Sequence, residues 1–438
     1  MQQALKAVLF DTDDALTVQA LPGTSRLAGA LRQAGIRIAL ISPNRSAHEV
    51  LHKAGGLDLF DTWVDAGDLA RLHLPGEPDP AVLLEAAARL AASPAQCAVI
   101  GDAIAGVQAG ARGGFGCVIG VDRGEHGAAL LEAGAHLVIH DLSELSLDSN
   151  RRLNVKTLAN LPSVWDRETQ LRERLAGQEL VVFLDYDGTL TPIVQDHTQA
   201  FLAPQMREAV HALSEVCTVA IVSGRDLAML QSLVQLDSVF YAGSHGFEIA
   251  GPAGSRHRLD KGVEFLAELD QAQQALRERL AGIEGHAVER KRFSLAVHFR
   301  QVADGDLGKL QARVDSVLAE HPRLKRGHGK KVFELQPDID WNKGQAVRWL
   351  LERLAAKRGA SVPIYIGDDI TDEHAFHALA GRGVCVAVRD GGMRQTAAEL
   401  ALADVDDVKR FVDMLSAIAS RRAPGSQGRR IAADPGSA

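Results

Sequence analysis

The chain has 438 residues, a formal net charge of −8 and a composition that is 46% hydrophobic and 24% charged, which is typical of soluble globular proteins with two or three domains. The acidic balance argues against nucleic acid or an anionic membrane as the main partner, and no apolar stretch is long enough to cross a bilayer. The first segment, MQQALKAVLFD, runs directly into a strand pattern, so it predicts neither a signal peptide nor a transit peptide.

Short β-branched runs alternate along the chain with longer segments rich in alanine and leucine. Apolar runs of this kind, bounded by helices, are typical of strands that are buried on both faces of a parallel sheet. The sequence therefore predicts doubly wound α/β domains, whose ligands bind at the carboxyl ends of the strands. The predicted strands are 7–11, 36–42, 97–102, 116–122, 180–185, 217–223, 239–243, 363–368 and 384–388.

The four cysteines lie beside such apolar runs and form no C-x-x-C pair; they are Cys97, Cys117, Cys217 and Cys385. This placement favours buried thiols in a reducing cytosol, with a metal or redox role as the alternative. We therefore expect a cytoplasmic protein.

The chain contains an internal repeat, since LFDTDDALT at 9–17 resembles FLDYDGTLT at 183–191. The same order of later motifs follows each copy: ISPNR (41–45) and IGDAIAGVQAG (100–110) after the first, VSGRD (222–226) and IGDDITDE (366–373) after the second. The repeat predicts two related α/β domains.

Spacing distinguishes the two copies. From Ser42 to Asp102 is 60 residues, whereas from Ser223 to Asp368 is 145, so the second copy carries about 85 more. That length predicts a small α+β domain inserted as a cap, with helices over 260–281 and 303–320 and strands over 293–299 and 331–337. The alternation in FSLAVHF (293–299) predicts a half-buried antiparallel strand.

The domain boundaries follow from these patterns and from composition. We expect a first domain over 1–148, a polar and partly helical linker over 149–178, a core over 179–246 and 338–420, the cap over 247–337, and a disordered Gly/Pro-rich tail over 421–438.

Two carboxylates end the first strand of the second half. Gly188, directly after Asp185 and Asp187, permits a tight turn that brings backbone N–H groups toward an anion. Such a pair followed by Gly-Thr suits phosphoryl transfer, in which one carboxylate attacks phosphorus and the other handles a proton. An isolated D-x-D also occurs where aspartate only caps a turn.

Three further motifs fit the same chemistry. IGDDITDE brings carboxylates to another strand end, and Mg²⁺ takes a few carboxylates together with waters and phosphate oxygens. Ser223 could donate a hydrogen bond to phosphate, and Lys343 of DWNKG could neutralise it. Each motif alone is a common turn or surface residue, but in this order, each at the end of an element, they indicate one phosphate site.

DYDGTLTPI, SGRD, DWNKG and GDDITDE resemble the four motifs of the haloacid-dehalogenase-type phosphatases. More narrowly, residues 180–415 resemble the trehalose-6-phosphate phosphatases, through YAGSHGFEI (241–249), VERKRFSLAVHFR (288–300) and KVFELQPDIDWNKG (331–344). The degenerate N-terminal copy is similar to that of the mycobacterial-type enzymes. The resemblance implies two Rossmann-like haloacid-dehalogenase-type domains, the second with an inserted C2-type cap. It also implies Mg²⁺-dependent hydrolysis of trehalose 6-phosphate to trehalose and phosphate through an aspartyl phosphate.

The resemblance also implies roles for single residues. Asp185 would be the nucleophile, and Asp187 would protonate the leaving sugar oxygen and then activate water. Asp185, the backbone carbonyl of Asp187 and Asp368 would hold Mg²⁺, with Asp369 and Asp372 in support. Ser223, Gly224 and Lys343 would bind the phosphate, and the sugar would contact His245, Gly246, Glu289, Lys291 and Glu334.

The residues of the cap allow two interpretations. Glu289 and Lys291 share a strand face and could both bind vicinal hydroxyls, or they could form a solvated salt bridge. The positive charge of the cap could attract a dianionic sugar phosphate, or it could be ordinary surface charge. It comprises Arg290, Lys291, Arg292, Lys325, Arg326, Lys330 and Lys331.

The first copy keeps several site residues, namely Asp11, Asp13, Ser42 and Asp102. Asp14 and Ala15, however, replace the Gly-Thr of the second copy, and Glu77 of PGEPDP stands where the third motif carries lysine. An added carboxylate repels a phosphate dianion. We therefore expect a phosphatase-like domain that does not catalyse, with a capless phosphatase for a large substrate as the alternative.

Other functions remain open for the whole chain. One is a phosphatase for another sugar phosphate, such as sucrose 6-phosphate. A second is a non-catalytic sugar-phosphate sensor, although a sensor needs neither Asp185 nor Asp187. A third makes the N-terminal half a protein-interaction module, for which the sequence indicates no partner.

Overall fold

The computed structural model describes residues 4–11, 21–42, 59–122, 126–194, 199–253, 255, 258–329, 331–358 and 361–421. The chain divides into two compact units. Unit 1 consists of Met1–Leu161 with Leu379–Gly383 and Gly391–Glu399, and unit 2 of Pro162–Ala378, Val384–Asp390 and Leu400–Ala438. The predicted disordered tail beyond Arg421 lies outside the described residues, as do Asp13, Asp14, Ala15 and Lys330.

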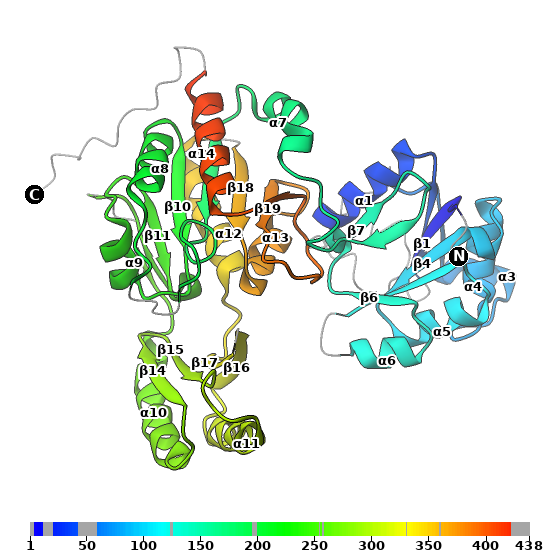
Figure 1. Cartoon of the computed structure of the whole chain (residues 1–438). Coiled ribbons are helices and arrows are strands. Elements are labelled where there is room, and N and C mark those ends of the chain that lie inside the picture. Colours follow the sequence, from blue (N-terminus) through cyan, green and yellow to red (C-terminus); the bar gives the residue numbers. More distant parts are fainter. Residues whose placement is uncertain are drawn as a thin grey trace, which may run out of the picture. The chain divides into compact units, whose positions relative to one another are not determined.

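Unit 1 contains a parallel sheet of six described strands in the order β3-β2-β1-β4-β5-β6 (Figure 1). The strands are β1 (Ala7–Asp11), β2 (Arg37–Ser42), β3 (Thr62–Asp65), β4 (Cys97–Gly101), β5 (Cys117–Val121) and β6 (Leu137–Ile139). The helices between them are α1 (Leu21–Gln33), α3 (Ala66–Leu72), α4 (Ala81–Arg89), α5 (Ile104–Arg112) and α6 (Gly127–Glu132).

The apolar runs of this sheet are buried on both faces, as the sequence predicts. Successive side chains of a strand point to opposite faces, so Val8 and Phe10 pack into one hydrophobic cluster while Ala7 and Leu9 pack into another. A short antiparallel pair, β7 (Leu145–Leu147) and β8 (Leu153–Val155), follows the sheet in unit 1.

Unit 2 contains a second α/β core with eight described strands in the order β13-β12-β11-β10-β9-β18-β19-β20. The strands β11, β10, β9, β18, β19 and β20 pair in parallel in that order. At the β11 edge of the sheet, β12 and β13 are added with antiparallel pairing. They are β9 (Leu180–Leu184), β10 (Thr218–Val222), β11 (Phe240–Gly243), β12 (Glu248–Ala250), β13 (Arg258–Asp260), β18 (Val362–Gly367), β19 (Val384–Val388) and β20 (Leu400–Leu402). The helices of this core are α7 (Glu168–Leu175), α8 (Pro204–Val216), α9 (Leu227–Val234), α12 (Lys343–Arg358), α13 (Glu373–Leu379) and α14 (Val405–Ser420).

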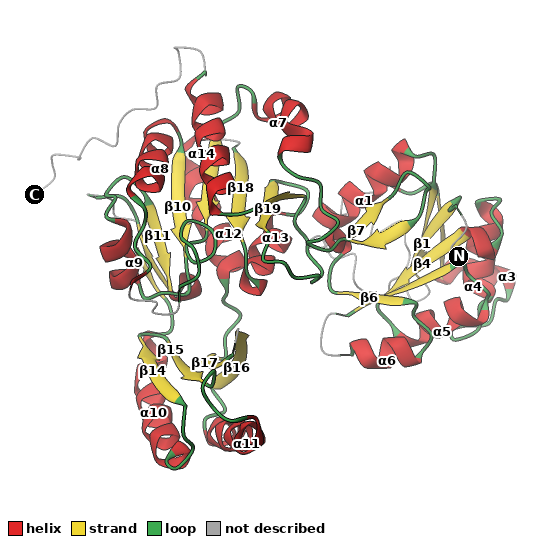
Figure 2. Ribbon diagram, viewed as in Figure 1, coloured by secondary structure: helices red, strands yellow, loops and turns green. Residues whose placement is uncertain are grey.

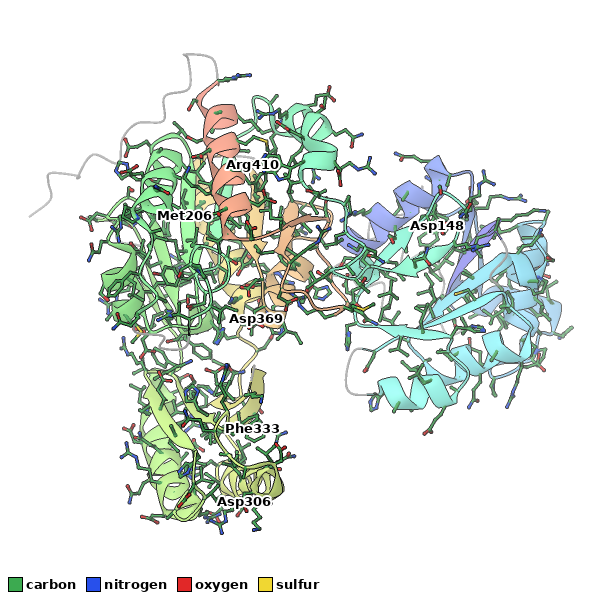
Figure 3. The ribbon with its side chains drawn as sticks, in the orientation of Figure 1. Asp148, Met206, Asp306, Phe333, Asp369 and Arg410 are labelled. Carbon is green, nitrogen blue, oxygen red and sulfur yellow. The ribbon has the colours of Figure 1, made fainter. Side chains whose placement is uncertain are left out.

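The cap is an antiparallel sheet of four described strands, in the order β14-β15-β17-β16, with two helices (Figure 2). Its elements are α10 (Leu266–Leu280), β14 (Ala287–Lys291), β15 (Ser294–His298), α11 (Asp304–Glu320), β16 (Leu324–Gly329) and β17 (Val332–Pro337). The helices pack on one face of the sheet, where Leu295, Val297 and Leu335 join a cluster with Leu269 and Leu310. In Figure 3, the label of Asp369 marks the side of the core that faces the cap. The labels of Phe333 and Asp306 mark the cap itself.

The nine predicted strands are all present, and the inserted cap has the predicted helices and strands. Two boundaries differ. Residues 248–250 and 258–260 pair with the core sheet, so the cap begins after them rather than at residue 247, because sequence pattern alone does not tell which sheet a strand joins. The predicted linker begins in unit 1, which extends to Leu161. The remaining boundaries stay predictions.

Two further expectations concern the whole chain. Cys97, Cys117 and Cys385 are buried free thiols and Cys217 is half-buried, so the cysteines form no disulfide. Burial raises the pKa of Cys97 to about 11. Among the helices that the structure describes, none has the length and apolar character needed to span a membrane.

Candidate active site

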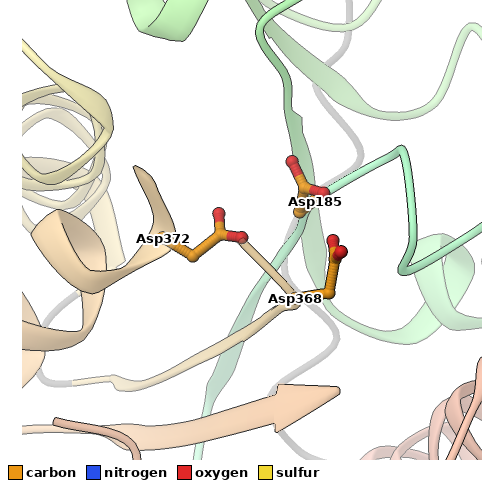
Figure 4. A group of neighbouring side chains, drawn as sticks. All are labelled: Asp185, Asp368 and Asp372. Carbon is orange, nitrogen blue, oxygen red and sulfur yellow. The ribbon is translucent and has the colours of Figure 1, made fainter. Parts of the chain in front are cut away.

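Three buried carboxylates meet at the carboxyl ends of two neighbouring strands of unit 2. Asp185 directly follows β9, Asp368 directly follows β18, and Asp372 lies in the short helical turn beyond. Because β9 and β18 pair in parallel, their ends lie at the same edge of the sheet. One oxygen of each side chain lies within 4.8 Å of the others, and Figure 4 shows the three side by side. We call Asp185, Asp368 and Asp372 the carboxylate cluster.

Lys343 inserts its ammonium group between two members of the carboxylate cluster. Its Nζ donates to Oδ1 of Asp185 and to Oδ1 of Asp372, each at 2.7 Å, and the side chain is buried. Asp372 also accepts from the Tyr365 hydroxyl at 2.7 Å and from the backbone N of Asp369 at 2.9 Å. Asp372 is thus fixed by three donors, and it holds Lys343 in place.

The electrostatics of the carboxylate cluster favour a divalent cation. Burial raises the pKa of Asp185 well above its usual value; Lys343 opposes this, while Asp372 and Asp368 add to it. Burial alone would lower the pKa of Lys343, but the carboxylates of Asp185 and Asp372 raise it above its usual value. One lysine facing three buried carboxylates leaves an excess of negative charge, which Mg²⁺, with its preference for carboxylate oxygens, would neutralise.

The turn after Asp185 brings the backbone close to Asp368. Gly188 has φ of 84°, a left-handed conformation that favours glycine, and its N–H donates to the carbonyl of Thr191 at 2.7 Å. A Cβ at Gly188 would lie 2.2 Å from Oδ2 of Asp368. The hydroxyl of Thr189 donates to Oδ1 of Asp368 at 3.4 Å. The Gly-Thr pair therefore lines the carboxylate cluster closely, which fits a small cation there.

Asp187 forms an ion pair that the sequence analysis missed. Arg225 donates to both its carboxylate oxygens, through Nε at 2.7 Å and Nη2 at 2.5 Å. The side chain of Arg225 is only 8% exposed and its guanidinium lies 5.4 Å from the ring centroid of Tyr186, whereas Asp187 is 40% exposed. The signal was the arginine of SGRD, a residue type that binds carboxylates bidentately.

The predicted phosphate residues lie at the same sheet edge. Ser223 directly follows β10, which pairs in parallel with β9, and its hydroxyl accepts from the backbone N of Arg225 at 3.2 Å. The carbonyl of Ser223 accepts from the backbone N of His245 at 2.8 Å. A Cβ at Gly224 would lie 2.8 Å from the His245 ring, so glycine permits this close packing. Gly246, next to His245, has φ of 91°.

The predicted sugar residues of the cap, Glu289, Lys291 and Glu334, lie on the face of the cap sheet opposite its helices. Glu334 on β17 accepts from Lys291 Nζ at 3.4 Å and from Ser294 Oγ at 2.8 Å, and its Oε2 lies 3.5 Å from Nε2 of His245. We call Lys291, Ser294, Glu334 and His245 the polar cleft cluster. It joins cap to core, because His245 follows β11 of the core.

Strand register explains this arrangement. Glu289 pairs with Ala296 on β15, and Ala296 pairs with Glu334 on β17, so all three side chains point to one face. A carboxylate oxygen of Glu289 lies 2.8 Å from Nε2 of His298 on the neighbouring strand. Ser294 and His298 were missed by the sequence analysis, although the alternation in FSLAVHF placed them opposite the apolar side chains. Ser294 is buried, so β15 is more enclosed than the predicted half-buried strand.

The charges of the polar cleft cluster balance one another. Burial would raise the pKa of Glu334, but Lys291 and His245 hold it well below its usual range. Burial would likewise lower the pKa of Lys291, but Glu334 and Glu289 raise it. Both groups are therefore charged at neutral pH, as recognition of sugar hydroxyls by ionic side chains requires.

Much of the remaining positive charge of the cap is paired. Arg290 lies 3.0 Å from Asp270, Arg326 lies 2.6 Å from Asp315 and Lys325 lies 3.5 Å from Asp338, while Arg292 pairs with Glu248. These contacts favour the interpretation as ordinary paired charge over a field that attracts the substrate. Lys291 differs, since it belongs to the polar cleft cluster.

The corresponding edge of unit 1 has a different set of groups. Asp11 and Ser42 end β1 and β2, as Asp185 and Ser223 follow β9 and β10. Gly106 stands four residues after Asp102, where Asp372 stands four after Asp368. A Cβ at Gly106 would lie 1.9 Å from Oδ2 of Asp11 and 3.4 Å from Oε2 of Glu77.

Glu77 therefore lies beside Asp11, where unit 2 places Lys343 beside Asp185. The carboxylates of Asp11 and Glu77 both lie next to Gly106, and this glycine takes the position that Asp372 has in unit 2. Because a phosphate group needs positive charge and hydrogen-bond donors, this arrangement opposes its binding.

Known protein families match the two halves of the chain separately. The trehalose-phosphatase family model matches residues 183–406, and a haloacid dehalogenase-like hydrolase model matches residues 3–114. The chain is 40% identical over 394 residues to an uncharacterized glycosyl hydrolase of Mycobacterium tuberculosis, covering 89% of the chain and only 29% of that relative. It is 41% identical over 338 residues to a trehalose-phosphate phosphatase of the same organism, covering 76% of the chain and 85% of that protein.

Among solved structures, the C-terminal domain of a trehalose-6-phosphate phosphatase from Candida albicans has the same fold as unit 2. It is 22% identical with a TM-score of 0.51, and the match covers 59% of this chain and 99% of that one. The two family models, together with this shared fold, confirm the predicted fold class of two haloacid-dehalogenase-type domains, the second with an inserted C2-type cap. The matching model over 183–406 and the 41% identical relative show that the chain belongs to the trehalose-phosphatase family.

Proposed function

We propose that this protein is a Mg²⁺-dependent phosphatase that hydrolyses trehalose 6-phosphate to trehalose and phosphate. One observation carries the proposal: buried Lys343 bridges Asp185 and Asp372, two members of the carboxylate cluster at the strand ends. Relatives of the chain that it covers over most of their length carry the name trehalose-phosphate phosphatase.

Asp185 has the position expected of a nucleophile. In the first step one of its carboxylate oxygens attacks phosphorus, the bond from phosphorus to the sugar oxygen breaks, and an aspartyl phosphate forms. In the second step water attacks phosphorus and the bond to Asp185 breaks, releasing phosphate. Lys343, hydrogen-bonded to Asp185, stabilises the negative charge of the phosphoryl oxygens in both steps.

The carboxylate cluster is the proposed metal site. Asp185 and Asp368, with the backbone carbonyl of Asp187, would hold Mg²⁺, and Asp369 and Asp372 would support them. When bound, the ion supplies positive charge toward the phosphate oxygens. The excess of carboxylates over lysine and the close approach at Gly188 support this assignment.

Asp187 is the proposed acid and base. It would protonate the leaving sugar oxygen in the first step and accept a proton from the attacking water in the second. Both of its oxygens accept hydrogen bonds from Arg225, so this ion pair must loosen before Asp187 can deliver a proton. Its 40% exposure leaves room for that movement.

The polar cleft cluster is the proposed site for the sugar. Lys291 and Glu334 are charged and hydrogen-bonded to each other, and Glu334 also lies 3.5 Å from His245 of the core. Glu289 and His298 extend the same face of the cap sheet. Ammonium and carboxylate groups bind vicinal hydroxyls, so this face suits a polyol rather than an apolar group.

A phosphate-release assay tests the proposal. We expect turnover of trehalose 6-phosphate with Mg²⁺, loss of turnover with EDTA and recovery when Mg²⁺ is restored in excess. Faster turnover of sucrose 6-phosphate would move the assignment to that substrate. Binding of trehalose 6-phosphate without phosphate release, with Mg²⁺ present, would favour the sensor function instead.

A further inference from the structure

The turn between β14 and β15 of the cap contacts the core through Arg292. The backbone N of Arg292 donates to both carboxylate oxygens of Asp226, at 3.0 and 3.1 Å. Its guanidinium pairs with Glu248 and lies 3.5 Å from Asp260. One residue of the cap thus contacts three acidic side chains of the core.

The core positions bound by Arg292 depend on a cation. Glu248 on β12 is paired directly with Asp260 on β13, and like charges directly opposite each other destabilise an antiparallel pair. The side chain of Glu248 is only 4% exposed, and burial raises its pKa while Arg292 opposes that effect. Arg258 of β13 pairs with Asp260 at 3.1 Å, and the arginine of the cap supplies the cation for the buried Glu248.

The second residue of the turn is an apolar anchor. Phe293 is 1% exposed and stacks on Phe247 of the core, with ring centroids 5.7 Å apart and an interplanar angle of 21°. Gly262, with φ of 82°, packs against both rings, since a Cβ there would lie 3.1 Å from Phe247 and 3.4 Å from Phe293. The guanidinium of Arg292 lies 5.0 Å from the Phe293 ring centroid.

The contact between the turn and the core lies next to the polar cleft cluster, both in the cap and in the core. In the cap, Lys291 and Ser294 flank the turn as a cross-strand pair, and both bind Glu334. In the core, His245 comes two residues before Phe247, and the Ser244 hydroxyl donates to Asp226 at 2.9 Å. A shift of the turn would therefore move Lys291 and Ser294 relative to His245.

We propose that Arg292 and Phe293 form a seat that fixes the cap on the core, and that Arg292 is thereby a positioning residue for sugar recognition. The inference rests on the proposed function. The chain crosses between core and cap twice, after Asp260 and after Pro337. Two crossings leave rotation about the line that joins them, and the seat favours the orientation in which Glu334 of the cap meets His245 of the core. In that orientation the polar cleft cluster is already assembled, which reduces the entropic cost of ordering it around the substrate.

Kinetics with two substrates test the seat. Arg292→Ala should lower kcat/KM for trehalose 6-phosphate by about 10- to 100-fold, mainly through KM, because leaving the buried Glu248 carboxylate without its cation has effects of this size. Hydrolysis of p-nitrophenyl phosphate, which has no sugar, should change less than about threefold. Arg292→Lys, which keeps a cation in reach of Glu248, should recover part of the loss.

Arg279→Ala is the matched control. Arg279 also pairs with a carboxylate, Glu320 at 2.6 Å, but both residues lie on the helices of the cap, away from the core. We expect both substrates to be turned over at the wild-type rate. Unchanged kcat/KM for trehalose 6-phosphate in Arg292→Ala would overturn the seat, and so would an equal loss on both substrates.

Hydrogen exchange gives a readout that does not depend on the substrate. Arg292→Lys and Phe293→Leu, which preserve charge or apolar volume, serve if Arg292→Ala fails to fold. Each should speed amide exchange in 287–298 and in 246–250, whereas Arg279→Ala should not. Wild-type exchange rates in both segments would contradict the seat. If wild-type protein releases no phosphate from trehalose 6-phosphate, the proposed function fails, and this comparison still decides on the seat.

Discussion

The two α/β sheets of this chain have the same strand order around their candidate sites. β1 lies between β2 and β4, and β9 lies between β10 and β18. Each central strand leads into an aspartate, Asp11 or Asp185. Beside Asp185 stands Lys343, whereas beside Asp11 stands Glu77. The same scaffold therefore presents opposite charges at the same position.

This difference teaches that the charge at one position, more than the fold, decides whether such a site suits phosphate. A lysine that bridges two carboxylates compensates their repulsion toward a dianion, whereas a second acidic group beside the aspartate strengthens that repulsion. The two halves also differ in whether a cap domain is inserted. The cap is inserted between β13 and α12 of unit 2, while only 60 residues separate Ser42 from Asp102 in unit 1.

The largest effect is expected at the two central aspartates. Asp185→Asn should lower turnover of trehalose 6-phosphate by at least about 10⁴-fold, because an amide cannot attack phosphorus. Asp11→Asn should leave turnover unchanged. Single-turnover phosphate release on the purified variants measures both. Activity of Asp185→Asn within about tenfold of wild type would refute the assignment, and loss of activity in Asp11→Asn would show that unit 1 takes part in catalysis.

The residues beside these aspartates should show the next largest contrast. Lys343→Ala removes the cation between Asp185 and Asp372, and we expect a loss of kcat of about 10³-fold, as for other groups that stabilise a transition-state charge. Glu77→Gln should leave kcat within about twofold of wild type. Steady-state assays with circular dichroism as a folding control decide the matter. A comparable loss in Glu77→Gln would mean that the two sites are functionally linked.

A smaller and selective effect is expected in the cap, which only the second copy carries. Glu334→Ala should lower kcat/KM for trehalose 6-phosphate by about 10- to 100-fold, because Lys291 and Ser294 lose their shared acceptor. Glu289→Ala should have a weaker effect of the same kind. Parallel assays with p-nitrophenyl phosphate serve as the control. An equal loss on both substrates would show that these residues support the fold rather than recognise the sugar.

The smallest effect concerns stability alone. Gly106→Ala places a methyl group against Asp11, so we expect about 1–3 kcal/mol of destabilisation in unit 1 and a melting temperature lower by a few degrees. Gly29→Ala, on helix α1 with open space around it, is the control and should be neutral or slightly stabilising. Calorimetry of the full chain measures both. Reduced phosphatase activity in Gly106→Ala would contradict the separation of the two sites.

The local pattern of the sequence was sufficient for the strands and for the residues that directly follow them. The run LVVFL ends at Asp185 and the run VPIYIG ends at Asp368, because a strand buried on both faces must be apolar until it reaches the polar edge of the sheet. The insertion of the cap could also be predicted, since the added chain length has no other place in a repeated fold.

The tertiary structure decided which of these residues meet. Arg225 reaches Asp187 across 38 positions of sequence, and Lys343 reaches Asp185 across 158. The sequence shows that this arginine and this lysine are present. They come within hydrogen-bond distance of the carboxylates only because β9, β10 and α12 pack together in the fold. For the same reason Arg292, part of an apparent basic patch in the sequence, is in the fold the partner of three acidic side chains of the core.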